Sequence, residues 1–327
     1  MALYLVTGGA GFIGSNVVEE LLRRGERVRI LDNFSTGKRD NVTEIQKILK
    51  NENDPHSLQR LELIEGDVRS YQTVREAVDD VDFILHQAAL PSIPRSIKDP
   101  ITTNEVNVVG TLNILNAAIE CKPNRVIYAS SSSVYGDLAT FPLTEEMLPR
   151  PLSPYAASKS AAEKYCQVFT RLYGLKTIVL RYFNVFGPRQ DPVSYYSAAI
   201  PKFIRLMKRG QSPTIYGDGE QSRDFTYVSN VVEANLLVCE KSLEGLSGEI
   251  FNVACGRSVT INELVSSINE LLGTKIAPTH ADSRPGDVRH SLSSIDKARQ
   301  LLGFEPKVAF YEGLSKLMGK VGEEQSQ

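Results

Sequence analysis

The stretch that decides the fold is Leu3-Tyr4-Leu5-Val6-Thr7-Gly8-Gly9-Ala10-Gly11-Phe12-Ile13-Gly14. Its first five residues predict a strand, and the glycines that follow fit the pattern GxGxxG at the start of an amphipathic helix. Glycine permits a tight turn there, lets backbone N–H groups approach a pyrophosphate, and allows the helix to pack closely on the strand. The N-terminus of the helix adds a partial positive charge. The stretch therefore predicts a dinucleotide site that includes Gly8, Gly11, Phe12 and Ile13.

A carboxylate after the second predicted strand indicates which dinucleotide binds. Asp32 follows Gly14 by eighteen residues and precedes Asn33, which we place beside it in the site. A carboxylate in this position can accept hydrogen bonds from both adenosine ribose hydroxyls and would repel a 2′-phosphate. The sequence therefore favours NAD over NADP as the cofactor. The alternative is that Asp32 only caps the turn that follows it.

The first half of the chain alternates apolar strand patterns with helical patterns. The predicted strands are Leu3–Thr7, Arg27–Leu31, Leu61–Glu65, Asp82–His86, Arg125–Ala129 and Lys176–Leu180. Alternating units of this length predict an α/β fold of the Rossmann type, with a doubly wound parallel sheet. Residues 40–60 are polar and predict a helix that runs into a surface loop.

The pattern changes after about residue 183 and predicts a smaller, mixed α/β C-terminal domain that binds the substrate. Helices are predicted at Ala199–Lys208, Val231–Glu240, Ile261–Leu271 and Ile295–Leu302. We assign residues 1–182 and about 215–257 to the dinucleotide domain. Residues 183–214 and about 258–320 form the second domain, and residues 321–327 are predicted to be a disordered tail.

The composition excludes several classes of protein. The net charge of −2 argues against a nucleic-acid partner. The sequence contains neither a run of apolar residues long enough to cross a membrane nor a signal peptide. The four cysteines and four histidines are scattered without the spacing of metal ligands. We therefore expect a cytoplasmic protein with free thiols and no metal site.

Tyr155 and Lys159 stand four residues apart and so on one face of a predicted helix that Pro154 begins. A free tyrosine has a pKa near 10, so a tyrosine that acts as a base at neutral pH needs about 4 kcal/mol of differential stabilisation. A desolvated Lys159 and a positive nicotinamide ring can supply it together, and Lys159 can also bind the nicotinamide ribose. The spacing alone is weak because amphipathic helices produce it by chance.

A run of serines strengthens this assignment. Ser130-Ser131-Ser132-Ser133 follows the fifth predicted strand directly, and ligands of open α/β sheets bind at the carboxyl ends of strands. A hydroxyl there can donate to a reacting hydroxyl and relay its proton. We assign the main catalytic hydroxyl to Ser131 and the next to Ser132. Simple loop packing is the expected role of the Ser130 hydroxyl, although Ser130 itself should line the cofactor.

Together these motifs resemble the extended short-chain dehydrogenases/reductases, whose glycine pattern GxxGxxG matches Gly8 to Gly14. The resemblance implies that Asp67 and Val68 flank the adenine and that Asn107 holds the backbone near the nicotinamide. It also implies further cofactor contacts at Gln87, Ala88, Ala89 and Tyr182.

Within this superfamily the chain resembles the UDP-hexose 4-epimerases, and most of all those that act on UDP-N-acetylglucosamine. The segments that carry the resemblance are residues 86–90, 94–100, 180–187 and 286–291. Sugar 4,6-dehydratases have an Asp-Glu pair where this chain has Ser132 and Ser133, and the related decarboxylases usually have a glutamate there. The resemblance implies a redox-neutral reaction in which Tyr155 removes the 4-hydroxyl proton, hydride moves to NAD⁺, and the 4-keto sugar turns over before hydride returns. NAD should therefore stay bound.

The same resemblance implies residues for the UDP-sugar. Arg223 and Arg284 would bind the phosphates, Asp287 the uridine ribose, and Asn184 the diphosphate or sugar. Tyr216 is assigned to the same site. The alternative for the two arginines is a surface salt bridge.

The size of the sugar is predicted from small residues. In the family, the residue at Ser291 controls the space beside C2 of the sugar, and a small side chain there admits an N-acetyl group. Ala198, which should line the pocket, is also small. Pro91 replaces a glycine usual in the closest branch and removes an N–H donor near the sugar, so UDP-glucose or UDP-glucuronate remain alternative substrates.

The helices at about 101–120 and 155–172 would pair in the family as a four-helix interface, which implies a homodimer. Two other classes share many of these motifs. A net oxidoreductase would consume NAD(H) stoichiometrically, and a non-catalytic dinucleotide-binding regulator would tolerate the loss of Tyr155.

Overall fold

The computed structural model describes residues 1–51, 57–191, 199–242, 244–282 and 289–323. Its centre is a sheet of seven parallel strands in the order β11-β6-β5-β4-β1-β2-β3. The strands are β1 (Leu3–Thr7), β2 (Arg27–Asp32), β3 (Leu61–Glu65), β4 (Phe83–His86), β5 (Arg125–Ser131), β6 (Thr177–Tyr182) and β11 (Ile250–Val253). The predicted α/β fold with a doubly wound parallel sheet is confirmed.

All six strands predicted from the sequence are present, and their ends differ from the prediction by at most two residues. Neighbouring side chains of a strand point to opposite faces of the sheet, so Val6 packs into one core and Leu5 into the other. The seventh strand, β11, was not predicted. It lies in the segment that the sequence assigns back to the first domain.

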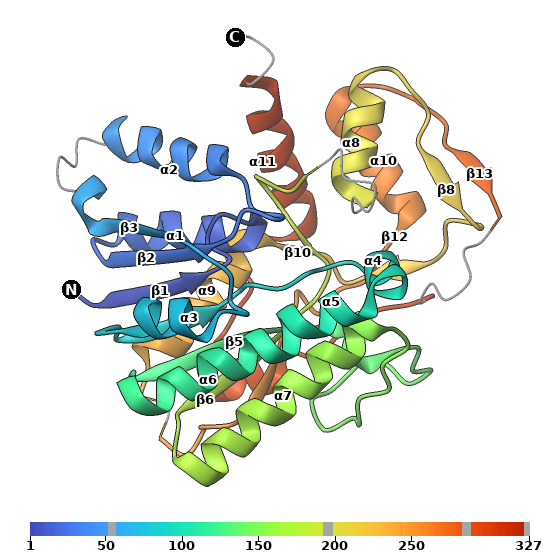
Figure 1. The fold of residues 1–327 in the computed structure, drawn as a ribbon. Helices are drawn as coiled ribbons and strands as arrows, with labels where there is room; N and C mark the ends of the chain where they lie inside the picture. Colours follow the sequence, from blue (N-terminus) through green and yellow to red (C-terminus); the bar gives the residue numbers. More distant parts are fainter. Residues whose placement is uncertain (52–56, 192–198, 243, 283–288, 324–327) are drawn as a thin grey trace.

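Helices cover both faces of the sheet (Figure 1). On one face lie α1 (Phe12–Arg23), α2 (Arg39–Asn51) and α9 (Val228–Glu240). The opposite face is covered by α3 (Tyr71–Val78), α6 (Gly110–Cys121) and α7 (Pro154–Tyr173). Shorter elements connect them: η1 (Ser57–Arg60), α4 (Ile93–Lys98), α5 (Pro100–Asn104), the π-helix η2 (Glu105–Val109), which leads into α6, and η3 (Ser132–Tyr135).

A third core lies beside the carboxyl ends of the strands. It is built by α8 (Ala199–Lys208), α10 (Ile261–Leu272) and α11 (Phe310–Glu323). Three short strand pairs complete it: β7 (Val185–Phe186) with β10 (Thr226–Tyr227), β8 (Thr214–Tyr216) with β13 (Thr279–Ala281), and β9 (Ser222–Arg223) with β12 (Val259–Thr260). Figure 1 shows α8, α10, β8 and β13 standing apart from the main sheet.

The packing differs from the predicted division of the chain in three places. Strands β8 and β9 pair with strands of the smaller unit, so the return to the main sheet begins at Val228 and not near residue 215. The helix predicted at Ile295–Leu302 is the short π-helix η4 (Ala298–Leu302), and it packs on the main core. Helix α11 includes residues 321–323 of the tail that the sequence predicts to be disordered. An amphipathic pattern shows that a helix buries one face, but it does not show which neighbour covers that face.

No helix within the described ranges is long and apolar enough to span a membrane.

Candidate active site

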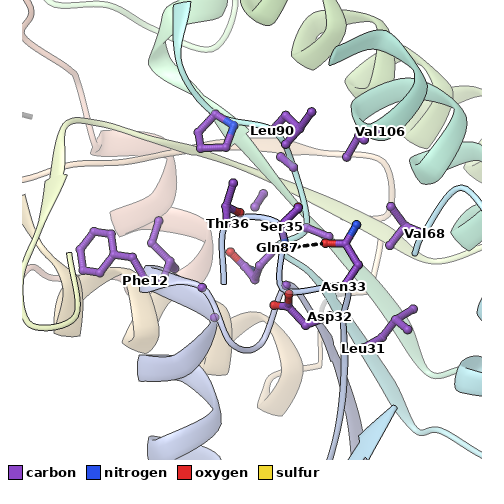
Figure 2. Close-up of a pocket in the computed structure, with 18 of the residues that line it drawn as sticks. Phe12, Leu31, Asp32, Asn33, Ser35, Thr36, Val68, Gln87, Leu90 and Val106 are labelled. Carbon is purple, nitrogen blue, oxygen red and sulfur yellow. Dashed lines mark hydrogen bonds between the residues drawn. The ribbon is translucent and has the colours of Figure 1, made fainter. Parts of the chain in front are cut away.

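A cleft of about 230 Å³ opens where the carboxyl ends of β1, β2, β4 and β5 meet the start of α1. Figure 2 shows side chains that converge on it from these elements. It is lined by fourteen residues that the sequence assigns to the cofactor: Gly8, Gly11, Phe12, Ile13, Asp32, Asn33, Val68, Gln87, Ala88, Ala89, Ser130, Tyr155, Lys159 and Tyr182. Residues outside the prediction that also line it include Ser35, Thr36, Gly66, Leu90 and Val106.

The glycines of the first turn leave room for a ligand and for close packing. Gly8 has a φ of +67°, and a Cβ there would lie 2.8 Å from the backbone of Ala88. A Cβ on Gly14 would lie 2.1 Å from the carbonyl oxygen of Gly8. Helix α1 has no side-chain cap at its N-cap residue, Gly11. Its first N–H groups therefore face the cleft with the positive end of the helix dipole, which suits a pyrophosphate.

Asp32 (Figure 2) is buried at the end of β2, and the backbone holds both of its carboxylate oxygens. One oxygen accepts a hydrogen bond from the N–H of Ala10 at 2.9 Å and the other from the N–H of Phe34 at 2.8 Å. Burial raises the pKa of Asp32, and these two hydrogen bonds lower it. A Cβ on Gly37 would lie 2.8 Å from the carboxylate, so the loop closes over it. The carboxylate is preorganised to accept hydrogen bonds from a ribose.

Two residues predicted to bind the cofactor do not line the cleft. Asp67 lies between Gly66 and Val68, which do line it, and accepts hydrogen bonds from Asn33 at 2.8 Å and from Arg69. The hydrogen bond from Arg69 lowers the pKa of Asp67 to about 2. Asp67 therefore holds the side chain of Asn33, which lines the cleft.

Asn107 is buried behind the cleft. Its Oδ1 accepts from the N–H of Leu90 at 2.8 Å, and its Nδ2 donates to the Leu90 carbonyl at 3.3 Å and to the Ser158 hydroxyl at 3.0 Å. It clamps the backbone of Leu90, which lines the cleft.

Tyr155 and Lys159 lie one turn apart on α7, which is capped by the Ser153 hydroxyl and begins at Pro154. Lys159 is 3% exposed, and its Nζ donates to the carbonyl of Ala129 at 2.7 Å. Burial lowers the pKa of Lys159 to about 7. Burial also raises the pKa of Tyr155, and a hydrogen bond with Ser131 opposes that rise.

A buried polar network supports the cleft at Gln87. The Gln87 amide donates to the hydroxyl of Tyr182 at 3.1 Å and to Oδ1 of Asn235 at 3.0 Å. Asn235 lies on α9, donates to the Tyr182 hydroxyl at 2.8 Å, and was not predicted. No sequence motif surrounds Asn235, so only the packing of α9 on the sheet reveals its role.

A second cavity, of about 510 Å³, adjoins the cleft and shares Phe12, Ile13, Ser130, Tyr155 and Tyr182 with it. Besides Tyr155, it brings together five residues that the sequence assigns to the substrate or to catalysis: Ser131, Ser132, Asn184, Arg223 and Ser291. Residues that line it without having been predicted include Ser92, Ile93, Ser133, Gln190 and His290. A sugar bound here would lie against Tyr155.

Two amides shape the wall of this second cavity. Asn184 adopts a φ of +35°, and its Nδ2 donates to the carbonyl of Asp224 at 3.3 Å. Gln190 donates its Nε2 to the carbonyl of Val185 at 3.1 Å, which fixes the orientation of its amide. Its Oε1 is buried and has no hydrogen-bond partner among the described residues. An acceptor in this state is matched by a hydroxyl or N–H on a ligand.

A third cavity, of about 290 Å³, continues from the second into the smaller unit and shares Asn184, Val185 and Arg223 with it. Tyr216, Lys202 and Phe225 also line it. The Arg223 guanidinium donates to the backbone carbonyls of Ser222 at 2.9 Å and Arg289 at 3.2 Å. These bonds hold Arg223 at the junction of the two cavities. The predicted residues Tyr216 and Arg223 are thus brought to one place.

Of the remaining predicted substrate residues, the structure describes only Pro91. Pro91 lines the dinucleotide cleft, while its neighbour Ser92 lines the sugar cavity. Ala198, Arg284 and Asp287 lie outside the described residues. Among the residues that were not assigned to the site, His290 lies within segment 286–291, next to Ser291, and this position is the one signal that could have found it.

Comparisons with known proteins extend this picture beyond the dinucleotide motif. A model of the NAD-dependent epimerase/dehydratase family matches residues 4–254. A putative UDP-glucose 4-epimerase of Methanocaldococcus jannaschii is 35% identical over 97% of each chain.

Two solved structures are similar over nearly their whole length. The UDP-N-acetylglucosamine 4-epimerase of Methanobrevibacter ruminantium, in complex with UDP-N-acetylmuramic acid, is 40% identical, with a TM-score of 0.90 and 99% of each chain covered. The UDP-glucose 4-epimerase of Thermus thermophilus in complex with NAD is 37% identical, with a TM-score of 0.84 over 97% of this chain and 98% of that chain. The similarity therefore includes the smaller unit.

Proposed function

The chain belongs to the NAD-dependent epimerase/dehydratase family, and we propose that it interconverts UDP-N-acetylglucosamine and UDP-N-acetylgalactosamine, with UDP-glucose and UDP-galactose as a second pair. The observation that carries the proposal is the sugar cavity, where Tyr155 faces a wall that contains the small, buried Ser291. This cavity adjoins the dinucleotide cleft on one side and the cavity around Arg223 on the other.

NAD is the cofactor of this family, and the cleft fits it in three respects. Added side chains at Gly8 or Gly14 would collide with neighbouring backbone, so this turn keeps the glycines that a pyrophosphate needs. The start of α1 lacks a side-chain cap. Asp32 is held to accept from a ribose. When bound, NAD would take a hydride from the sugar and return it within each turnover.

Tyr155 is the group that exchanges a proton with the sugar 4-hydroxyl. Lys159 stabilises the phenolate of Tyr155 by its charge, because both side chains are buried where solvent screens little. Ser131, which hydrogen-bonds Tyr155, holds the reacting hydroxyl and relays its proton, and Ser132 extends this polar wall. Ser131 in turn accepts hydrogen bonds from the N–H of Ser133 at 3.2 Å and from its hydroxyl at 3.0 Å.

We assign the nucleotide part of the substrate to the cavity around Tyr216 and Arg223. A guanidinium there can bind phosphate oxygens, and Asn184 can contact the diphosphate or the sugar next to it. Arg284 and Asp287 remain predicted contacts of the phosphates and the uridine ribose. A firm hold on UDP allows the sugar to turn while the nucleotide stays bound.

UDP-glucuronate is a second candidate substrate, and the charge of the sugar cavity favours it. The described residues that line this cavity include Arg223 and His290 but neither aspartate nor glutamate. A carboxylate on the sugar would therefore meet donors and no like charge.

The test uses purified protein without added cofactor, incubated separately with UDP-N-acetylglucosamine, UDP-glucose and UDP-glucuronate, with products followed by proton NMR. We expect UDP-N-acetylgalactosamine to form fastest. Turnover of only one of the other sugars would keep the epimerase and overturn the substrate assignment. In a parallel incubation with added NAD(H), stoichiometric consumption of the nucleotide would instead identify a net oxidoreductase.

We further propose that the protein is a homodimer paired through the helices around α5 and α7. These helices pack against each other, yet they expose apolar side chains, with Ile101 71% and Leu172 68% exposed. Val109 on η2 and Val168 on α7 are exposed as well. A second copy can bury this surface in a four-helix bundle. Light scattering of the protein as it elutes from a size-exclusion column should give twice the mass of one chain. The substitution Leu172→Glu should lower the measured mass toward that of one chain.

A further inference from the structure

Helix α7 faces the end of strand β5 with three residues spaced one turn apart: Tyr155, Lys159 and Glu163. Each is bonded to a different residue of β5. Tyr155 hydrogen-bonds Ser131, Lys159 donates to the carbonyl of Ala129 at 2.7 Å, and Glu163 accepts from the Ser130 hydroxyl at 2.5 Å. Along β5, the contacts of Lys159 and Tyr155, which serve the reaction, therefore lie on either side of the contact between Glu163 and Ser130, which does not.

The Glu163 carboxylate is completely buried and held from two strands. Arg181 on β6, which pairs with Ser130 in the sheet, donates to both Glu163 oxygens at 2.8 and 2.7 Å. The Arg181 guanidinium in turn lies 4.7 Å from the centre of the Tyr135 ring. These contacts leave Glu163 little freedom to move relative to the sheet.

Stability alone does not account for this arrangement. A buried ion pair contributes little net free energy, because the desolvation of both charges offsets their attraction. A fixed pair of charges does, however, define geometry, and a displacement of about 1 Å in a reacting group can cost a large factor in rate.

We propose that Glu163 is a positioning residue: through the Ser130 hydroxyl it fixes the end of β5, so that the Ala129 carbonyl meets Lys159 and the Ser131 hydroxyl meets Tyr155. The inference rests on the proposed function, because it assigns the reaction to Tyr155 and Lys159.

Glu163 also supplies the negative charge that favours the protonated Lys159. The other groups around Lys159 are Cys166 on α7, the Tyr128 ring on β5 at 4.9 Å and the buried His86 on β4. Burial lowers the pKa of His86 to about 3, so this histidine is uncharged. Burial lowers the pKa of Lys159, and Glu163 is the main opposing influence.

The first experiment compares Ser130→Ala with Thr177→Val. The Thr177 hydroxyl makes a matched bond between the sheet and α7, to the carbonyl of Cys166 at 3.2 Å, but away from the reacting end. We expect Ser130→Ala to lower kcat roughly 3- to 10-fold, with KM and NAD content unchanged. The Tm of Thr177→Val should fall by about as much as that of Ser130→Ala, while its kcat should stay at the value of the wild type. Equal kcat in all three proteins would overturn the proposal.

The second experiment separates positioning and charge from stability by the pH profile. Glu163→Gln removes the charge that keeps Lys159 protonated, so the alkaline limb of kcat should move to lower pH by on the order of one unit. Glu163→Gln leaves the buried Arg181 without its partner, so the single variant can fail to fold. In that case the double variant Glu163→Gln/Arg181→Met is measured, because it removes both charges. A uniform loss of kcat at every pH, with the limb in place, would show a merely structural role.

A third readout does not depend on turnover. In a crystal structure of Ser130→Ala, the distance between Lys159 Nζ and the Ala129 carbonyl should lengthen beyond a hydrogen bond, and an unchanged distance would contradict the proposal. If the wild type epimerises none of the sugars, the proposed function fails, and this distance alone decides the positioning role. If the wild type is active, the kinetic comparison decides it.

Discussion

The dinucleotide cleft and the sugar cavity share Tyr155, but they are built in different ways. The cleft lies along successive strand ends, and its ligand groups are largely backbone atoms near Gly8, Gly11 and Asp32. The sugar cavity is assembled from side chains of distant segments, from Ser92 to Ser291. The first is a property of one motif, and the second depends on how the smaller unit packs on the sheet.

Substitutions in the two sites should therefore alter different properties of the protein. Substitutions in the cleft should change cofactor binding without changing the choice of sugar. Substitutions in the cavity should do the reverse. Loss of the reaction while both ligands still bind is expected only for residues that take part in the proton transfer, above all the shared Tyr155.

The largest effect is expected for Tyr155→Phe, at the junction of the two sites. Epimerisation should fall about 1,000-fold or more, because the phenol is the group that exchanges the proton. Bound NAD should stay at the level of the wild type, since the ring is retained. Product NMR and nucleotide extraction measure the two quantities. Activity within tenfold of the wild type would assign the proton transfer to another group.

Ser291→Tyr tests the cavity alone. Ser291 is buried in the wall, so a phenol there should fill space beside the sugar. We expect kcat/KM for UDP-N-acetylglucosamine to fall about 100-fold relative to that for UDP-glucose, a difference of ~3 kcal/mol. The kcat/KM ratio of the two substrates is the measurement, and Ser291→Ala is the control. An unchanged ratio would place the acetamido group elsewhere.

Asp32→Asn tests the cleft alone. Loss of the charged acceptor should weaken NAD about 10- to 30-fold, as a hydrogen bond to a charged group is worth roughly 1.5–2 kcal/mol. The preference against NADP should shrink at the same time. Asp296→Asn is the control, because Asp296 is exposed and is not among the residues that line the cleft. Calorimetric titration of the NAD-free protein measures both, and equal affinities of the two variants would deny Asp32 its role.

The smallest effect concerns stability and pH. Burial lowers the folded pKa of Lys159 to about 7 from its ordinary value near 10.5. Between these pH values Lys159 is more protonated in the unfolded chain than in the folded protein, so its contribution to stability rises with pH. NAD-free Lys159→Met should therefore be more stable than the wild type at pH 7 by roughly 2 kcal/mol, after the unpaired Ala129 carbonyl is counted. The difference should shrink toward pH 10.

Urea unfolding at several pH values checks this, with the exposed Lys164→Met as a control that should show no such trend. A difference between Lys159→Met and the wild type that stays constant with pH would mean that Lys159 is not deprotonated in the folded protein over this range.

The sequence predicted the part of the cleft around the glycine turn and Asp32 because this part is local. The glycine turn, the helix after it and Asp32 lie within one strand–helix–strand unit, so spacing alone brings them together. The wrong expectations arose where distant segments meet. Pro91 lines the cleft and Ser92 the cavity, and the Ser130 hydroxyl bonds Glu163 instead of only packing in its loop.

By itself, the sequence determined the parallel sheet, the dinucleotide site and the pairing of Tyr155 with Lys159, because strand and helix periods set which side chains share a face over short distances. Only the tertiary structure decided that Asn235, Gln190 and His290 adjoin these residues, and that Glu163 meets Ser130 across two elements. Such contacts join residues far apart in the chain. Their partners are chosen by the packing of whole helices and strands, which no local pattern records.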